Sequence, residues 1–145
     1  MMDDQALREL LETSKTIAVV GASNNPARAS LGVARFLQWQ GYRVIPVNPN
    51  EVEVLGERAY ASIEDIPEPV DIVDIFRRSS TVSGIVDAAI AKAPRCIWMQ
   101  EGVINEEAAA KAEAAGIPVV MDRCILKELG RLFPLQRHAN NPVNP

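Results

Sequence analysis

Residues 16–30 read Thr16-Ile17-Ala18-Val19-Val20-Gly21-Ala22-Ser23-Asn24-Asn25-Pro26-Ala27-Arg28-Ala29-Ser30. The apolar run Thr16–Gly21 is rich in β-branched residues and lacks clean alternation, which is typical of a strand covered on both faces. After the polar stretch, apolar residues recur at helical spacing from Leu31 until Gly41, a natural helix stop. The segment therefore predicts a buried strand, a polar turn and a helix.

Further short apolar runs follow along the chain, at Tyr42–Val47, Val70–Ile75, Arg95–Met99 and Ile117–Met121. Helical patterns separate or flank them, starting near Asp3 or Asp4, at Val82, after Asn105 and over Ile125–Leu132. Alternating strands and helices predict βαβ units and a parallel sheet with helices on both faces. We therefore predict an α/β, three-layer, doubly wound (Rossmann-like) fold with a five-stranded parallel sheet, in the order 3-2-1-4-5.

Composition limits the class of protein. The chain has 145 residues, with Lys+Arg 15 against Asp+Glu 19, a net charge of −4 and 48% hydrophobic residues. This content suits one domain over residues 1–145, with a core at about 13–133 and a proline-rich tail at 134–145. The acidic balance argues against nucleic-acid binding, and no apolar run approaches the ~20 residues of a membrane span. The N-terminus does not resemble a signal peptide, so we expect a cytoplasmic protein that does not bind membranes.

The turn after the first predicted strand carries groups suited to an anion. Gly21 lets backbone amides approach a ligand, and the following helix N-terminus adds partial positive charge. Ser23, Asn24 and Ser30 offer hydrogen bonds, and Arg28 is able to hold a phosphate in a bidentate fork. An ordinary turn, with Ser30 as an N-cap and Arg28 in solvent, explains the same residues equally well.

This turn departs from the nicotinamide dinucleotide fingerprint. That fingerprint has three glycines as G-x-G-x-x-G, whereas this chain has Gly21, Ser23 and Pro26 at those places. It also has an acidic residue at the end of the second strand, where this chain has Val47-Asn48-Pro49 and reaches Glu51 only after the proline. The sequence therefore argues against a nicotinamide-dependent dehydrogenase.

The next two strand ends carry further candidate binding groups. The third strand ends in Phe76-Arg77-Arg78, in which an aromatic ring beside paired arginines offers a face for a purine and donors for phosphate. A core phenylalanine and solvated arginines are the alternative interpretation. The fourth strand ends in Gln100-Glu101-Gly102. Because the carboxyl ends of parallel strands meet at one edge, we expect these groups to lie together.

The sequence shows few groups suited to catalysis. The single histidine, His138, lies in the tail, which gives no support to a Ser-His or Cys-His pair. Cys124 follows Asp122-Arg123, where the arginine could lower the thiol pKa. The alternative is a packed cysteine, with Asp122 and Arg123 bonded to each other or to loop backbone. The sequence thus favours a protein without a catalytic set of its own.

Other candidate groups are equally weak. Asp71 is expected at the exposed start of the third strand and Asp74 near its ligand edge, so they form no obvious acid–base pair. Two cysteines, Cys96 and Cys124, make neither a disulfide framework nor a zinc site. We therefore predict no metal site.

Several segments together resemble the small stand-alone CoA-binding proteins. The resemblance covers about residues 13–133 and rests on 17–23 with Pro26, Arg28 and Ser30, then 41–49, Leu55-Gly56, 70–78, Trp98-Met99-Gln100 with Gly102, and 119–124. These proteins are similar to the CoA-binding domain of succinyl-CoA synthetase α-subunits and of NDP-forming acyl-CoA synthetases. Those enzymes carry their phosphohistidine and nucleotide machinery on other domains, which this sequence does not match.

The resemblance implies a ligand and a placement for it. The pyrophosphate of CoA would lie over Gly21–Asn24 and the helix start at Ser30, with Arg28 nearby. Adenine and ribose would lie between 47–49 and 76–78, and the pantetheine arm would run toward 100–102. The implied binding residues are Gly21, Ala22, Ser23, Asn24, Arg28, Ser30, Val47, Asn48, Pro49, Phe76, Arg77, Arg78, Gln100 and Gly102.

One departure from the resemblance concerns the 3′-phosphate of CoA. Relatives often place a basic residue just after the proline that follows the second strand, whereas this chain has Asn50-Glu51. CoA, an acyl-CoA and another adenine nucleotide therefore all stay open as ligands. We predict a non-enzymatic CoA or acyl-CoA binding module. The alternatives are an enzyme that uses Cys124 or Asp122, and a subunit that serves a synthetase-like partner; a homodimer is a further prediction from the unprotected sheet edges.

Overall fold

The computed structural model describes residues 2–134, and its centre is a five-stranded sheet in the order β2-β1-β5-β6-β7. The strands are β1 Thr16–Val20, β2 Arg43–Val47, β5 Ile72–Ile75, β6 Cys96–Met99 and β7 Val119–Val120. All neighbouring pairs are parallel. The predicted α/β class, the parallel sheet and the five strands are confirmed.

The predicted strand order, 3-2-1-4-5, is wrong. Numbered in the same way, the observed order is 2-1-3-4-5, because β5, the third predicted strand, lies between β1 and β6 instead of outside β2. All four residues of β5 are buried, which suits a central strand. The point at which the strand order reverses therefore lies between β1 and β5.

The segment after β2 explains this order. It forms a small antiparallel hairpin, β3 Glu53–Val54 and β4 Glu57–Arg58, followed by the short 3-10 helix η1 Ile63–Asp65. Tyr60 then forms a parallel bridge with Val47: its N–H donates to Pro46 O (3.0 Å), and its carbonyl accepts from Asn48 N (2.8 Å). The backbone around Tyr60 thus occupies the outer edge of β2 near its carboxyl end, so the next strand pairs elsewhere.

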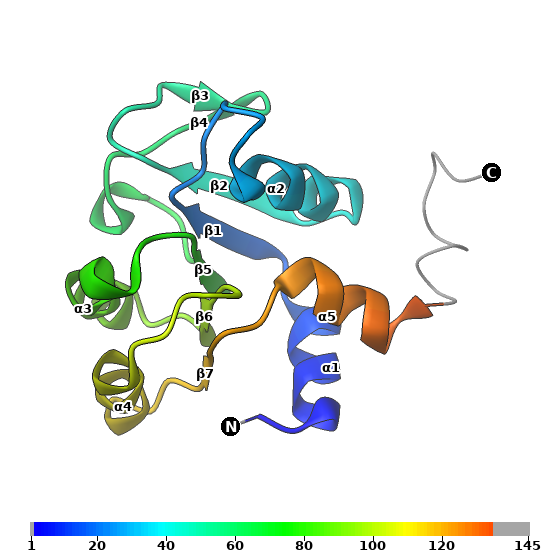
Figure 1. The fold of residues 1–145 in the computed structure, drawn as a ribbon, viewed down its shortest axis with the longest axis vertical. Coiled ribbons are helices and arrows are strands. Elements are labelled where there is room, and N and C mark those ends of the chain that lie inside the picture. The colour runs from blue at the N-terminus through cyan, green and yellow to red at the C-terminus, as the bar shows by residue number, and fades with distance from the viewer. Residues whose placement is uncertain (1, 135–145) are drawn as a thin grey trace.

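Helices cover both faces of the sheet (Figure 1). On one face lie α1 Asp4–Thr13, α2 Ala29–Trp39 and α5 Ile125–Leu132, whose buried residues pack with Ile17, Val19 and Trp98. On the other face lie α3 Val82–Lys92 and α4 Glu106–Ala114. The 3-10 helix η2 Ser79–Thr81 directly precedes α3. These two faces are named below the α2 face and the α3 face. The predicted three-layer arrangement is therefore confirmed.

The helix starts follow the sequence signals at two places and not at a third. Asp3 caps α1 by accepting from Ala6 N (2.8 Å), and Asn105 caps α4 by accepting from Ala108 N (2.9 Å). The alternative that Ser30 caps α2 is wrong, since Arg28 is the N-cap, without a side-chain bond, and Ser30 lies buried in the first turn. The N-terminus of α2 thus lacks a side-chain cap.

Within residues 2–134, no helix is long and apolar enough to cross a membrane, and no group of three potential ligands could hold a metal ion. His138 and the predicted tail, apart from Pro134, lie outside the described residues.

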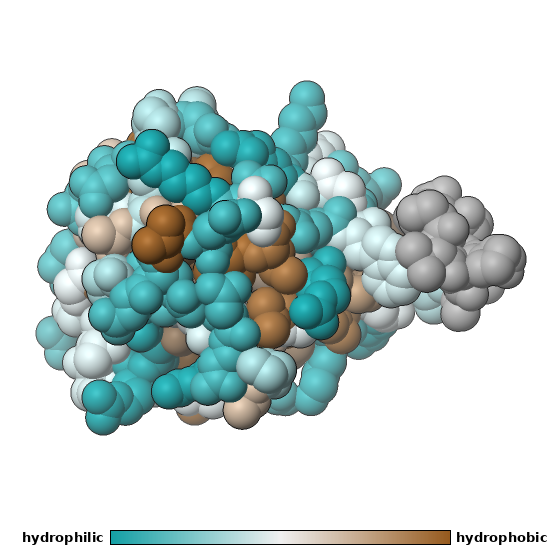
Figure 2. Space-filling model, turned by 90° about the horizontal axis from the view of Figure 1, so that it is seen from above, coloured by the Kyte–Doolittle hydropathy of each residue, from teal (hydrophilic) through white to brown (hydrophobic). Residues whose placement is uncertain are grey.

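Seen from the side of the β3–β4 hairpin, apolar surface gathers in the middle of the face and polar residues surround it (Figure 2). The most exposed large apolar side chain of the described residues is Val52, between β2 and β3, at 87% exposure.

Candidate functional site at the carboxyl ends of the strands

The turn after β1 requires glycine. Gly21 has φ +92°, and a Cβ added there would lie 2.2 Å from the carbonyl oxygen of Phe76. Its N–H donates to Val47 O (2.8 Å), while Phe76 N donates to Val20 O (2.8 Å). Backbone hydrogen bonds therefore hold the ends of β1, β2 and β5 together at Gly21, a residue without a side chain.

The loop that follows, residues 22–28, is ordered by short-range and cross-loop hydrogen bonds. Asn25 N donates to Ser23 Oγ (3.0 Å), and Ala27 N donates to Asn25 Oδ1 (2.9 Å). Asn48, which is 8% exposed, donates from Nδ2 to Ala22 O (2.8 Å). Asn48 thus joins the start of the loop to the end of β2.

Glu51 binds this loop from the β3–β4 side. Asn24 N donates to Glu51 Oε2 (2.7 Å), and Asn24 Nδ2 donates to Glu51 Oε1 (2.9 Å) and to Glu53 O (2.7 Å). The backbone and side-chain hydrogen bonds from Asn24 lower the pKa of Glu51. A carboxylate thus already occupies part of the loop predicted to receive phosphate.

A cavity of about 240 Å³ opens at the switch point between β1 and β5, on the α3 face. Three predicted site residues line it, Val47, Pro49 and Arg77. The rest of the lining comes from β1, the η1 region and α3: Val20, Ala61, Ser62, Ile63, Glu64, Gly84, Ile85 and Ala88. We name it the switch-point cavity.

Sequence reasoning missed the α3 and η1 side of the cavity. Gly84 and Ile85 belong to the helix predicted to start at Val82, and neither residue was singled out from the sequence. Had the strand order been known, the rule that ligands bind at the switch point would have drawn attention to the helix that follows β5.

The structure places Phe76 and Arg77 on opposite faces. Phe76 is half-buried and packs with the cluster on the α2 face, whereas Arg77 lines the switch-point cavity on the α3 face. Arg78 is exposed and precedes η2. Of the predicted aromatic–arginine group, Arg77 alone reaches the cavity.

Gln100 and Gly102 lie near α5. Gln100 is 4% exposed, and its Oε1 accepts from Ile125 N (3.1 Å) at the start of that helix. Gly102 N donates to Asp122 Oδ1 (2.8 Å). These hydrogen bonds join the segment after β6 to the start of α5 and to the segment after β7.

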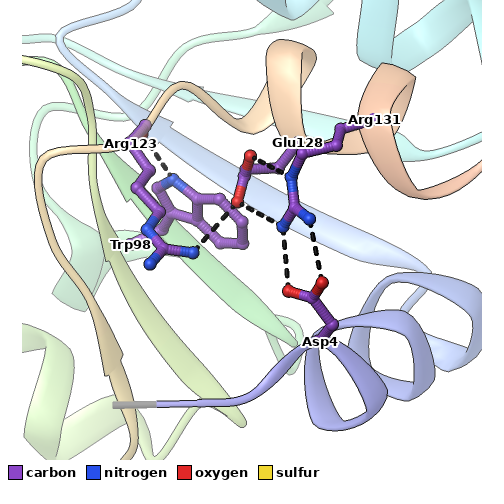
Figure 3. A network of polar contacts seen from close by, with 5 residues as sticks. All are labelled: Asp4, Trp98, Arg123, Glu128 and Arg131. Carbon is purple, nitrogen blue, oxygen red and sulfur yellow. Dashed lines mark hydrogen bonds and ion pairs between the residues drawn. The ribbon is translucent and has the colours of Figure 1, made fainter.

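A second, more polar cavity of about 410 Å³ lies beside α5, and Cys124 is on its wall. Charged side chains there pair with one another (Figure 3): Arg131 bonds both Asp4 (2.9 and 3.0 Å) and Glu128, and Arg123 bonds Glu128 (3.1 Å). Trp98 Nε1 donates to Arg123 O (2.8 Å). The arginine network thus ties α1 to α5.

In the alternative interpretation, Asp122 and Arg123 bond each other or the loop backbone. This is confirmed for Asp122, which bonds loop backbone, whereas Arg123 pairs with Glu128 instead of Asp122. Burial raises the pKa of Cys96 to about 12. This thiol is therefore not suited to act as a nucleophile.

Asp74 is a buried carboxyl group in the centre of the sheet. It lies between Val19 and Trp98 in register, is 0% exposed, and neither oxygen has a hydrogen-bond partner within residues 2–134. Desolvation raises its pKa well above the usual range. The hydroxyl of Ser30 is also buried and lacks a partner in the same part of the chain.

We predict that Asp74→Asn raises stability at neutral pH. The folded-state pKa of Asp74 lies above its unfolded value, so the wild type loses stability as pH rises from the unfolded pKa toward the folded one. The loss is about 1.4 kcal/mol for each pH unit in that window. Urea unfolding between pH 4 and 8 measures it: the difference between variant and wild type grows with pH, and parallel curves would contradict the account.

The fold and this edge define a Rossmann-like α/β domain with a cavity at the switch point of its parallel sheet. Residues 15–130 match the family model described as CoA binding domain, and the chain belongs to that family. It is a small CoA-binding domain protein, related to the CoA-binding domains of ADP-forming acetyl-CoA synthetases.

Individual relatives agree with this assignment. The chain is 42% identical over 119 residues to the uncharacterized protein YneT of Bacillus subtilis, covering 82% of this chain and 88% of that one. It is similar to the solved structure of cell-free ID.343 from Thermus thermophilus, at 46% identity and a TM-score of 0.88, covering 91% and 100% of the two chains. It is also 47% identical over 60 residues to the α-subunit of the ADP-forming acetate–CoA ligase II of Pyrococcus furiosus, covering 41% of this chain and 13% of that one.

Proposed function

We propose that this protein binds CoA or an acyl-CoA at the carboxyl edge of its sheet, without catalysis of its own. The observation that carries the proposal is the switch-point cavity, because three residues implied by the family resemblance, Val47, Pro49 and Arg77, come together on its wall. Its volume of about 240 Å³ lies below the ~300–1,000 Å³ of whole-ligand pockets, so it suits one part of a larger ligand. The adenine ring is that part.

The loop beside the cavity suits the pyrophosphate. Gly21 brings the start of the loop close to the backbone of Phe76, and glycine itself adds no side chain to this part of the loop. The N-terminus of α2 has no side-chain cap, and Arg28, its N-cap residue, is exposed. Exposed amides and a cation at a helix N-terminus attract an anion. CoA, which joins a purine to a pyrophosphate, matches both the cavity and the loop.

The remaining implied contacts fit less directly. Phe76 packs on the α2 face and Gln100 Oε1 bonds the start of α5, and neither residue lines the switch-point cavity. The pantetheine arm is therefore proposed to run along the exposed backbone at Gly102, toward the polar cavity beside α5. An acyl group would extend from there.

Replacing Arg28 tests the proposal. If Arg28 holds a phosphate, Arg28→Ala costs about 1.5–3 kcal/mol, the range of a charge-assisted hydrogen bond, and weakens CoA binding roughly 10- to 100-fold. Isothermal titration calorimetry measures it. The matched control is Arg35→Ala, which removes an exposed arginine further along α2. Equal affinities for the two variants would remove Arg28 from the site, and no heat with wild type would contradict CoA binding itself.

A second candidate function rests on the likeness to the acetate–CoA ligase α-subunit. In it, the protein lends its CoA site to a separate catalytic partner. Affinity purification of the full chain from its native cell, followed by mass spectrometry, tests this function. It predicts a synthetase-like protein among the captured partners, and the absence of any such protein would count against it.

A further inference from the structure

The contact between Glu51 and the loop after β1 is an unusual one for a site that receives phosphate. Both oxygens of the Glu51 carboxylate accept hydrogen bonds from one residue, Asn24, at 2.7 Å from its backbone N–H and 2.9 Å from its side-chain amide. Two oxygens of a phosphate group are able to accept from the same kind of donors. The carboxylate thus has the chemistry of the expected ligand.

The contact also joins two segments that are distant in sequence. Asn24 lies in the β1–α2 loop, and its side chain bonds the backbone carbonyl of Glu53 at the start of the β3–β4 hairpin (2.7 Å). The three bonds of Asn24 therefore hold the hairpin against the loop. We name them the Glu51 latch.

The charge of Glu51 is balanced by the loop and not by a cation. Within residues 2–134, no salt bridge to Glu51 is found, and the groups that lower its pKa are hydrogen-bond donors of Asn24 and Ser23. An incoming phosphate therefore meets a like charge at the donors it needs. The two anions are not able to use the Asn24 N–H together.

Beside the Glu51 latch there is open space into which the Glu51 side chain is able to move. A cavity of about 630 Å³ is lined by Glu51, Val52, Glu53 and Arg58, and Arg58 lies over the ring of Tyr60 at 5.0 Å. Val52, next to Glu51, is the most exposed large apolar residue of the described chain. Glu51 is thus on a surface segment, and its side chain is able to leave the loop without disturbing the core.

We infer that Glu51 is an internal competitor for the phosphate-binding loop, so that a pyrophosphate ligand binds by displacing the Glu51 carboxylate from Asn24. This inference rests on the proposed function and adds a selectivity rule to it. Ligands with phosphate at the loop meet the competitor, whereas ligands that use only the switch-point cavity do not. Glu51 therefore lowers affinity for phosphorylated ligands selectively.

Calorimetric titration of wild type, Glu51→Gln and Glu53→Gln tests the inference. Both variants remove one negative charge from the same segment, but the Glu53 contact with Asn24 is made by its backbone, so only Glu51→Gln weakens the latch. The probes are CoA, ADP and adenosine. Glu51→Gln is expected to bind CoA and ADP about tenfold more tightly than wild type, the size of effect of one charged hydrogen bond. Adenosine affinity is expected to stay within twofold.

The other outcomes are decisive as well. Equal gains in both variants, or an equal gain for adenosine, would show a general charge effect and overturn the latch. A weaker affinity of Glu51→Gln for CoA would make Glu51 a ligand contact, which overturns the latch and keeps the proposed function. No CoA binding by any of the three proteins would overturn the proposed function, and the latch with it. Thermal unfolding of both variants checks that they are folded.

Discussion

Replacing Gly84 with phenylalanine is expected to abolish CoA binding and leave the fold intact. Gly84 is an exposed residue of α3 that lines the switch-point cavity, and a Cβ added there meets no atom within 4 Å. A phenyl ring would fill the space proposed for the adenine. Burying about 150–200 Å² of a planar ring contributes roughly 4–5 kcal/mol at ~25 cal/mol/Å², so the loss in affinity is several hundredfold or more.

The control for this variant is Gly130→Phe. Gly130 is likewise an exposed helical glycine with no atom within 4 Å of an added Cβ, but it lies in α5 on the other face of the sheet. Both substitutions replace a poor helix former, so neither is expected to destabilise its helix. Calorimetry with CoA is expected to show binding by the Gly130 variant and none by the Gly84 variant. Equal binding by the two would exclude the switch-point cavity as the site of the base.

Gly21→Ala is expected to cost about 3–5 kcal/mol of folding free energy. The substitution strains a backbone at φ +92° by about 1–2 kcal/mol and forces the added Cβ away from Phe76 O, 2.2 Å distant. Moving these segments breaks the bonds from Gly21 N to Val47 O and from Phe76 N to Val20 O, at about 1 kcal/mol each. Because domains are commonly stable by only about 5–15 kcal/mol, much of the protein's stability is lost.

Urea unfolding measures this loss against Gly41→Ala. Gly41 has a similar φ, +99°, but an added Cβ there meets nothing within 4 Å, so that variant carries the backbone strain alone. Its expected cost is about 1–2 kcal/mol. A similar cost for the two variants would mean that the close approach of β1 and β5 is not what requires glycine at position 21.

The fold was predictable from local pattern, and the strand order was not. The five strands were predictable because each is a short buried run bounded by turn residues, as in Thr16–Val20 followed by Gly21. The order depends on which strand takes the outer edge of β2, and here the backbone of Tyr60 takes it. No propensity marks that pairing, because it is made by backbone groups of a residue outside any strand.

The candidate site was predictable where it depends on the backbone path. Gly21, Val47 and Pro49 stand at strand ends, and the parallel sheet brings them to one edge. The sequence did not predict which face of the sheet a side chain just past a strand end lies on. Phe76 and Arg77, which are neighbours in sequence, lie on opposite faces. The sequence also marked Asn50-Glu51 as a departure from relatives, but only the structure brings Glu51 onto Asn24, 27 residues away.

Native mass spectrometry of freshly purified, unheated protein, before and after addition of CoA, tests CoA binding most directly. We expect one CoA or acyl-CoA bound per chain, with the mass of any acyl group readable from the adduct. We also expect that Gly84→Phe carries no adduct under the same conditions. A wild-type protein that shows neither a co-purified nor an added CoA adduct would contradict CoA binding at this edge of the sheet.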